Sequence, residues 1–298
     1  ALTENQGFDP GRVTNVGSGL ERAPAIMDTL LYRDELTDEV SPKLAKGISS
    51  TDGQTWVLEL REGVNFSDGT PLDAEAVIFN LQRHISPDST STAKAMLSAI
   101  DTMEATGDHE VTFTLKQPSG SFPLALTGSS PASLIGSPAA RADPEAFNGD
   151  PVGAGPFVLE SWVRDDTLTL TKNADYWDEG KPYLDGVEYH VRVDPQTRTD
   201  DLIAGGTDLA LVPGSAWTQV GSIPTIELKP IPTGGEAVIP NASKGPFADA
   251  RLREALLYTF SGETTAGVLF GGTENWDGTT DCIPFPVGSR ACLEGATY

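Results

Sequence analysis

Carboxylates are the most numerous reactive side chains in this sequence, with 43 Asp and Glu residues among 298. Two carboxyl groups held at a fixed separation across a cleft can hydrolyse a glycosidic bond. With so many acidic residues, pairs that lie close together in the sequence arise by chance, and no single pair stands out. The carboxylates alone therefore do not indicate a glycosidase.

Other catalytic and cofactor-binding patterns are missing from the sequence. It contains no G-x-S-x-G motif, and Ser119-Gly120-Ser121 is not framed by the strand and helix of a nucleophile elbow. Gly153-Ala154-Gly155 and Gly205-Gly206 lack the spacing of dinucleotide-binding and P-loop motifs. The histidines, at positions 84, 109 and 190, show no paired-ligand spacing. The sequence therefore predicts no catalytic centre, no metal site and no cofactor.

Cys282 and Cys292 are the only cysteines, and they lie in one segment rich in proline and glycine. In an oxidising compartment a disulfide is the simplest interpretation of such a pair, and the short loop it closes would contribute roughly 2–3 kcal/mol. Two free thiols are the alternative.

The charge of the chain limits its partners. The net charge is -23 and the pI is near 4.3. Nucleic acids and anionic membranes need a cationic protein surface, so neither is expected as a partner. No apolar run reaches the ~18 residues that predict a transmembrane helix. No signal-peptide pattern opens the chain, so an exported protein would already have lost its leader.

A strand, a turn and a helix are predicted in the first third of the chain. Trp56, Leu58 and Leu60 alternate with Val57 and Glu59, which predicts a strand with one apolar face. Asp68-Gly69 is a turn dipeptide. Asp73 is the predicted N-cap of a helix whose apolar face comprises Val77, Leu81 and Ile85.

A mixed α/β pattern continues through the rest of the sequence. Helices are predicted at residues 21–31 and 249–260, and strands at 111–115, 168–170, 187–193 and 208–212. Trp56 and the pair Tyr176-Trp177 are interpreted as packing residues, Asp9-Pro10 as a turn, and Arg251 and Arg253 as partners of surface carboxylates.

The stretch 56–83, with its strand, turn and helix, resembles the family 5 extracellular solute-binding proteins of ABC importers, the oligopeptide, dipeptide and nickel class. Further stretches match this family in the same order. They are Phe8-Asp9-Pro10, residues 41–45, residues 153–157, residues 173–177, residues 182–185, residues 205–208 and residues 246–253.

The resemblance implies a two-lobed α/β fold of the periplasmic-binding-protein type (class II) with an extra inserted domain. Domain I would comprise residues 1–31 and 151–240, domain II residues 32–150, and domain III would begin with residues 241–298. Chains of this family continue well beyond this length. We therefore expect an incomplete second lobe, weak ligand binding by these 298 residues, and a second copy of the chain covering the exposed face.

The resemblance also implies the ligand-binding residues. In this family the ligand lies between the first and third domains. Carried over to this sequence, the ligand-binding residues are Thr14, Asn15, Val16, Gly17, Val212, Gly214, Ser215, Trp217, Glu236 and Asn241. Small residues expose backbone groups that can hold an extended peptide, and Trp217 can form the wall of an apolar pocket.

The implied function is extracytoplasmic capture of an oligopeptide or similar solute for delivery to the permease subunits of an ABC importer, without covalent chemistry. The protein would be periplasmic or a cell-surface lipoprotein. Two alternatives remain at this point. One is a secreted sensor or carrier with the same fold, and the other is a secreted hydrolase.

Overall fold

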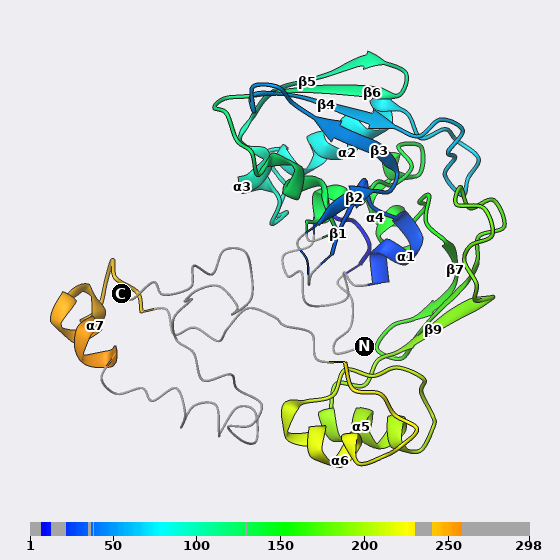
Figure 1. Cartoon of the computed structure of the whole chain (residues 1–298), viewed down its shortest axis with the longest axis vertical. Coiled ribbons are helices and arrows are strands. Elements are labelled where there is room, and N and C mark those ends of the chain that lie inside the picture. The colour runs from blue at the N-terminus through cyan, green and yellow to red at the C-terminus, as the bar shows by residue number, and fades with distance from the viewer. Residues whose placement is uncertain are drawn as a thin grey trace. The chain divides into compact units, whose positions relative to one another are not determined.

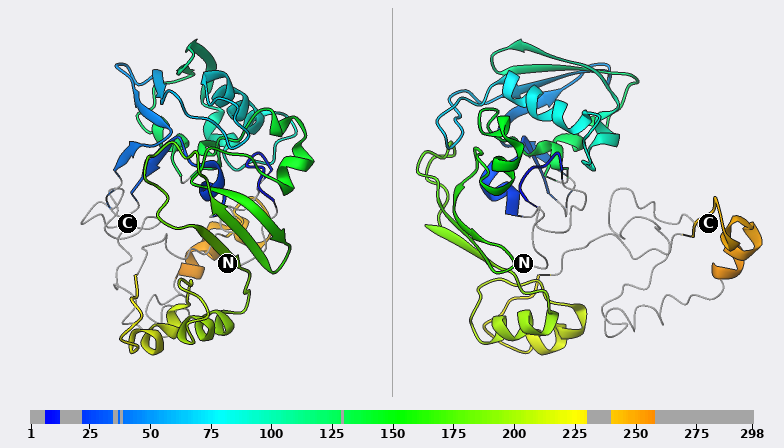
Figure 2. Two further views of the ribbon diagram at one scale, coloured as in Figure 1. Left: turned by 90° about the vertical axis from the view of Figure 1, so that its right-hand side faces the viewer. Right: turned by 180° about the vertical axis from the view of Figure 1, so that it is seen from behind.

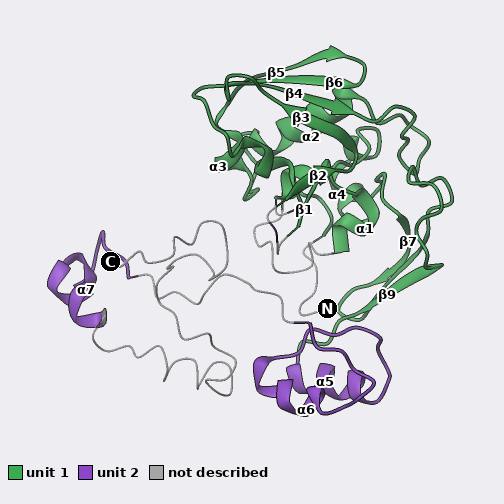
Figure 3. Ribbon diagram, viewed as in Figure 1, with its two compact units in different colours: residues 1–34, 39–193 green, residues 35–38, 194–298 purple. Residues whose placement is uncertain are grey.

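The computed structural model describes residues 7–12, 22–34, 37, 39–128, 130–229 and 240–257 (Figure 1). The chain splits into two compact units, residues 1–34 with 39–193 (unit 1) and residues 35–38 with 194–298 (unit 2), as Figure 3 shows. The predicted α/β class is confirmed, whereas the assignment of residues to three domains stays a prediction. Among the described residues, no helix is both long and apolar enough to cross a membrane.

A four-stranded antiparallel sheet forms one layer of unit 1, with the strand order β3-β4-β6-β5. Its strands are β3 (Ala45–Ser49), β4 (Thr55–Leu60), β5 (Ile100–Gly107) and β6 (Glu110–Leu115). One face is apolar because Leu58 and Leu60 alternate with exposed or half-buried residues along β4. The strands predicted at 56–60 and 111–115 are confirmed. Trp56 packs against this core, as predicted.

Helix α2 (Ala74–Ile85) begins where the sequence predicts. The Asp73 carboxylate accepts a hydrogen bond from the Ala76 N–H at 2.8 Å, which satisfies one free donor of the first turn. Val77 and Leu81 are fully buried in the same core as the four-stranded sheet. The prediction fails for Ile85, which is exposed because the helix ends there.

Unit 1 also contains a three-stranded antiparallel sheet, which Figure 2 shows apart from the four-stranded sheet. It consists of β7 (Phe157–Val163), β8 (Thr167–Lys172) and β9 (Gly186–His190), and the short helix α1 (Ala23–Met27) packs on it. The predicted strand at 168–170 is confirmed. The strand predicted at 187–193 ends at His190.

Two glycines allow the chain to pass closely over α1 on its way into β7. A Cβ on Gly153 would lie 2.4 Å from the Ile26 carbonyl oxygen, and one on Gly155 would lie 2.5 Å from the same oxygen. The Gly155 N–H donates to that oxygen at 2.7 Å. Gly153-Ala154-Gly155 therefore marks a close backbone contact.

The predicted helix at 21–31 is shorter in the structure. Helix α1 ends at Met27 because Asp28 has a positive φ of 59°, and the Asp28 N–H donates to the Pro24 carbonyl oxygen. The chain then enters β1 (Leu31–Arg33), which pairs with β2 (Val40–Pro42). The predicted helix was too long because a left-handed residue stops it.

The remaining described elements are short. In unit 1 they are α3 (Lys94–Leu97), α4 (Pro144–Gly149) and three 3-10 helices, Phe122–Leu126, Pro131–Ser133 and Ala140–Ala142. In unit 2 they are α5 (Pro195–Ile203), α6 (Trp217–Gly221), α7 (Ala250–Leu257) and two 3-10 helices, Gly214–Ala216 and Pro246–Ala248. The predicted helix at 249–260 is confirmed for Ala250–Leu257, and residues 258–260 lie outside the described residues.

The strand predicted at residues 208–212 is wrong. In the structure these residues form no strand, and the described part of unit 2 contains no strand for them to pair with. Alternating apolar residues become a strand only when a neighbouring backbone supplies hydrogen bonds.

Candidate functional site

The predicted ligand-binding residues are only partly described. Thr14, Asn15, Val16, Gly17 and Glu236 lie outside the described residues, as do Cys282 and Cys292. The structure places Val212, Gly214, Ser215 and Trp217 together on one continuous segment of unit 2, and Asn241 in a separate turn.

The segment with Val212 is held by helix α5 and by its own turn. The α5 N-cap is Asp194, whose carboxylate accepts from the Thr197 N–H at 2.7 Å. From the next turn of α5, Arg198 Nε donates to the Leu211 carbonyl oxygen at 3.0 Å. The Ala216 N–H then donates to the Pro213 carbonyl oxygen at 2.9 Å. The chain is extended at Pro213, passes through the 3-10 helix Gly214–Ala216 and enters α6 at Trp217.

This segment presents polar backbone together with apolar side chains. Leu209 is 89% exposed and Leu211 is 56% exposed. Within the described residues, the N–H groups of Leu209, Ala210 and Val212 have no hydrogen-bond partner. Gly214 and Ser215 follow with small side chains, and Trp217 is half-buried at the start of α6. An extended peptide could form main-chain hydrogen bonds with such a segment.

Asn241 has a local role in the structure. Its side-chain oxygen accepts from the Ser243 N–H at 3.1 Å and from the Ser243 hydroxyl at 2.8 Å. This is an Asx turn on an exposed stretch.

In the same region Arg251 pairs with Asp249 at 2.6 Å, as predicted. Arg253 donates to the carbonyl oxygens of Phe247 and Ala248. The hydrogen bonds from Arg251, followed by the charge of Arg253, lower the pKa of the same Asp249 carboxylate.

A buried carboxylate that the sequence did not single out lies at the end of α1. The two oxygens of Asp28 accept hydrogen bonds from Tyr176 Oη at 2.7 Å, Trp177 Nε1 at 3.1 Å and the Thr29 N–H at 2.8 Å. Lys43 Nζ lies 2.7 Å from the same carboxylate. Burial, followed by the charge of Asp28, raises the pKa of Tyr176, so its hydroxyl stays a donor. The prediction of simple aromatic packing for Tyr176-Trp177 is therefore incomplete.

A second buried charge cluster surrounds Asp9. The prediction of a turn is confirmed, because the Gly11 N–H donates to the Asp9 carboxylate at 3.0 Å. The carboxylate also pairs with Arg141 and, at 2.8 Å, with Arg83 of α2. Burial alone would raise the pKa of Asp9, but the charges of Arg141 and Arg83 and the Gly11 hydrogen bond lower it overall. No local pattern indicated these partners, which are far from Asp9 in the sequence.

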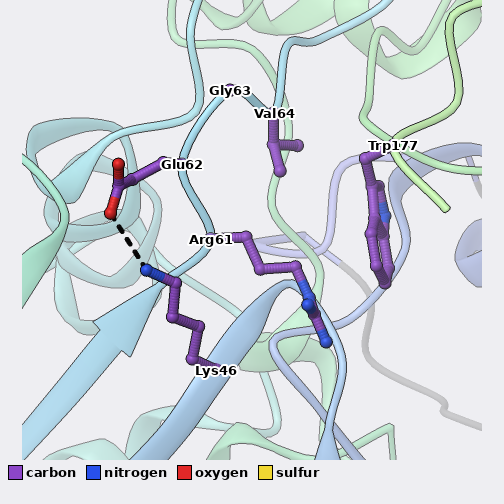
Figure 4. Close-up of a pocket in the computed structure, with 6 residues that line it drawn as sticks. All are labelled: Lys46, Arg61, Glu62, Gly63, Val64 and Trp177. Carbon is purple, nitrogen blue, oxygen red and sulfur yellow. Dashed lines mark hydrogen bonds and ion pairs between the residues drawn. The ribbon is translucent and has the colours of Figure 1, made fainter.

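A shallow cavity of about 410 Å³ opens beside the Asp28 cluster. Figure 4 shows the residues that line it, which are Lys46, Arg61, Glu62, Gly63, Val64 and Trp177. The Arg61 guanidinium carbon lies 4.6 Å from the centroid of the Trp177 ring, in a cation–π contact. Lys46 Nζ donates to the Glu62 carboxylate at 3.0 Å, and this lowers the pKa of Glu62.

Curated relatives of this chain are solute-binding proteins. The glutathione-binding protein GsiB of Salmonella paratyphi A is 33% identical over 241 residues, which cover 78% of this chain and 46% of the relative. GsiB of Escherichia coli K12 is 34% identical over 229 residues, covering 75% of this chain and 44% of the relative. The chain thus spans about half the length of the curated relatives it matches.

Solved structures with the same fold confirm the predicted fold class. The oligopeptide-binding protein AppA from Bacillus subtilis, in complex with a nonapeptide, has a TM-score of 0.75 at 26% identity, over 91% of this chain and 55% of that one. The periplasmic binding protein DppA from Helicobacter pylori, in complex with the peptide STSA, has a TM-score of 0.75 at 24% identity, over 90% of this chain and 57% of that one. At this identity the DppA match supports the fold alone.

The family that matches is described as "Bacterial extracellular solute-binding proteins, family 5 Middle", and the match covers residues 39–281. This family comprises binding proteins and not enzymes, in agreement with the sequence-based expectation. The chain belongs to the family 5 bacterial extracellular solute-binding proteins.

Proposed function

We propose that this chain belongs to the solute-binding component of an ABC importer and that its solute is a short peptide or a peptide-like molecule. The observation that carries the proposal is the family match over residues 39–281, together with 33% identity to a glutathione-binding relative. Glutathione is itself a tripeptide, and the similar AppA structure holds a nonapeptide. These matches favour a ligand with peptide groups.

The proposed mechanism is capture by closure of two lobes around the solute, with no covalent step. A solute stabilises the closed form only through contacts that the open form lacks. In this chain, the residues proposed to contribute are Val212, Gly214, Ser215, Trp217 and Asn241, together with Thr14, Asn15, Val16, Gly17 and Glu236 from outside the described residues. The N–H groups of Leu209, Ala210 and Val212, which lack a partner within the described residues, support main-chain recognition of an extended ligand.

We further propose the domain assignment given above, with residues 32–150 inserted into domain I. Three contacts support it, because the chain just before the insert and the chain just after it both contact residues 133–136. Thr29 bridges to Leu134, Gly136 bridges to Gly153, and the Leu30 N–H donates to the Ser133 carbonyl oxygen at 3.1 Å. An extracytoplasmic location, a lipid anchor and a Cys282–Cys292 disulfide complete the proposal and rest on the sequence and the family.

Native mass spectrometry of the protein purified from its source, followed by calorimetry, tests the proposed function. We expect a retained mass in the range of short peptides, and saturable binding of glutathione or of members of a defined peptide pool. Trp217→Ala should weaken that binding, because it removes the half-buried aromatic side chain at the start of α6. Thr218→Ala, an exposed neighbour on α6, is the matched control.

Two results would contradict the proposal. The first is turnover of any bound peptide or ester, which would indicate an enzyme. The second is a retained solute without peptide groups, such as a bare metal chelate, which would keep the binding function but overturn the ligand class. Loss of solute uptake after deletion of the gene separates an importer component from a sensor or carrier.

A further inference from the structure

The cavity beside Trp177 is lined by the guanidinium of Arg61. Arg61 Nε donates to the Lys43 carbonyl oxygen, which fixes one edge of the group. The Trp177 ring covers one side of it, with 4.6 Å between the guanidinium carbon and the ring centroid. Within the described part of the chain, neither terminal nitrogen of Arg61 has a hydrogen-bond acceptor. An Arg held in this way is ready to bind an anion without further ordering.

The charges around the cavity favour an anion, although the whole chain is strongly acidic. The nearby Asp28 carboxylate is already paired with Lys43 at 2.7 Å. Lys46 pairs with Glu62, but their side chains are 47% and 73% exposed. Exposed pairs of this kind contribute only about 0–1 kcal/mol, so a bound anion can take over Lys46. The residues that line the cavity include two cations, Arg61 and Lys46, and one anion, Glu62.

We propose that this cavity binds a small organic carboxylate. The planar fork of Arg61 matches the two oxygens of a carboxylate, and Lys46 supplies a second cation. The half-buried Trp177 ring offers apolar surface for the carbon atoms of the ligand, which inorganic phosphate lacks. A volume of about 410 Å³ falls within the range of small-molecule sites. The site differs from the proposed solute site and does not depend on it, since none of its lining residues is among those proposed to bind the solute.

Titration of the 298-residue chain with succinate and citrate, followed by NMR and calorimetry at constant ionic strength, tests this site. We expect saturable binding at millimolar concentration, tighter than that of inorganic phosphate. Arg61→Lys should weaken binding roughly tenfold or more, because the fork is lost. Lys46→Gln should weaken it about threefold. Glu62→Gln should strengthen it about threefold, because it removes the competing carboxylate.

Lys116→Gln is the matched control, since it removes one positive charge from an exposed lysine at the end of β6, which is not part of the cavity lining. It should leave binding unchanged. Lys46→Gln and Glu62→Gln change exposed side chains, so both variants should fold. They test the carboxylate site even if Arg61→Lys does not fold. The proposal is overturned if neither acid binds saturably, if phosphate binds as tightly as the carboxylates, if Glu62→Gln has no effect, or if Lys116→Gln weakens binding as much as Lys46→Gln.

Discussion

Asp9 and Arg141 form an ion pair in which both side chains are fully buried, although 132 residues separate them in the sequence. Arg83 approaches the second oxygen of the same carboxylate at 2.8 Å. The neighbouring backbone is tied to the same region, because the Phe8 N–H donates to the Asn148 carbonyl oxygen at 3.2 Å and Ser89 Oγ donates to the Gly11 carbonyl oxygen at 3.1 Å. The segment 7–12 is therefore fixed by residues of the proposed insert.

Asp9→Asn should destabilise the fold by about 3–5 kcal/mol, because it leaves Arg141 buried without its counter-charge. Urea unfolding followed by circular dichroism measures the change. Glu145→Gln is the control, since it breaks only the exposed pair that Glu145 forms with Arg12 at 2.5 Å. That variant should change stability by less than about 1 kcal/mol. Equal losses of stability in the two variants would show that the buried pair stabilises the fold no more than the exposed pair does.

His84 should make the protein lose stability from pH 6.5 downwards. Its Nδ1 lies 2.6 Å from Ser91 Oγ in a buried site. Burial, followed by the charges of Arg141 and Arg83, lowers its pKa from 6.5 to about 3, although Asp9 acts in the opposite direction. The folded form therefore keeps a neutral imidazole while the unfolded chain takes up a proton. The stability gained above pH 6.5 is lost as the pH falls towards about 3, by up to about 1.4 kcal/mol per pH unit.

The free energy of unfolding, measured by urea titration between pH 7 and 4, checks this prediction in the wild type and in His84→Asn. The variant removes the titrating group, so its stability should fall less steeply over the upper part of this range. Asp9 also contributes to the pH dependence of stability, but at lower pH. Because its pKa is lowered in the folded protein, its carboxylate stabilises the fold above the ordinary pKa of 3.8, and this stabilisation is lost as the pH falls below that value. If the free energy of unfolding falls equally with pH in the two proteins, His84 is not the cause of the loss.

Tyr176→Phe should cost about 1.5–3 kcal/mol, because it removes one hydrogen bond to the buried carboxylate of Asp28. The measurement is urea unfolding, and the control is Tyr183→Phe, whose ring is 85% exposed. The control should stay within about 0.5 kcal/mol of the wild type. In a double-mutant cycle, Asp28→Asn and Tyr176→Phe should show coupling. Strict additivity would mean that the 2.7 Å contact contributes nothing.

The sequence predicts those parts of the fold that local patterns control. The Asp73 cap and the alternation in β4 depend on residues a few positions apart, so both are found where expected. Asp28 was missed because its partners Tyr176 and Trp177 lie 148 and 149 residues away. The same holds for Asp9 and Arg141. Only the order of motifs along the chain indicated the candidate ligand segment at Val212, because its chemistry resides in backbone groups that leave no pattern of side chains.

Gly153→Ala should destabilise the fold strongly, because the added methyl group would meet backbone and not a movable side chain. Its Cβ would lie 2.4 Å from the Ile26 carbonyl oxygen and 2.5 Å from Met27 Cα. Relief requires α1 to move away from the chain that enters β7, which would disturb the Gly155–Ile26 hydrogen bond. Overpacking of this kind typically costs about 1–3 kcal/mol. Gly149→Ala is the matched control, since nothing lies within 4 Å of a Cβ at that exposed position. Thermal unfolding of the two variants side by side should show a lower midpoint for Gly153→Ala alone. An unchanged midpoint would mean that α1 can shift without loss, and that the glycine is not required by this contact.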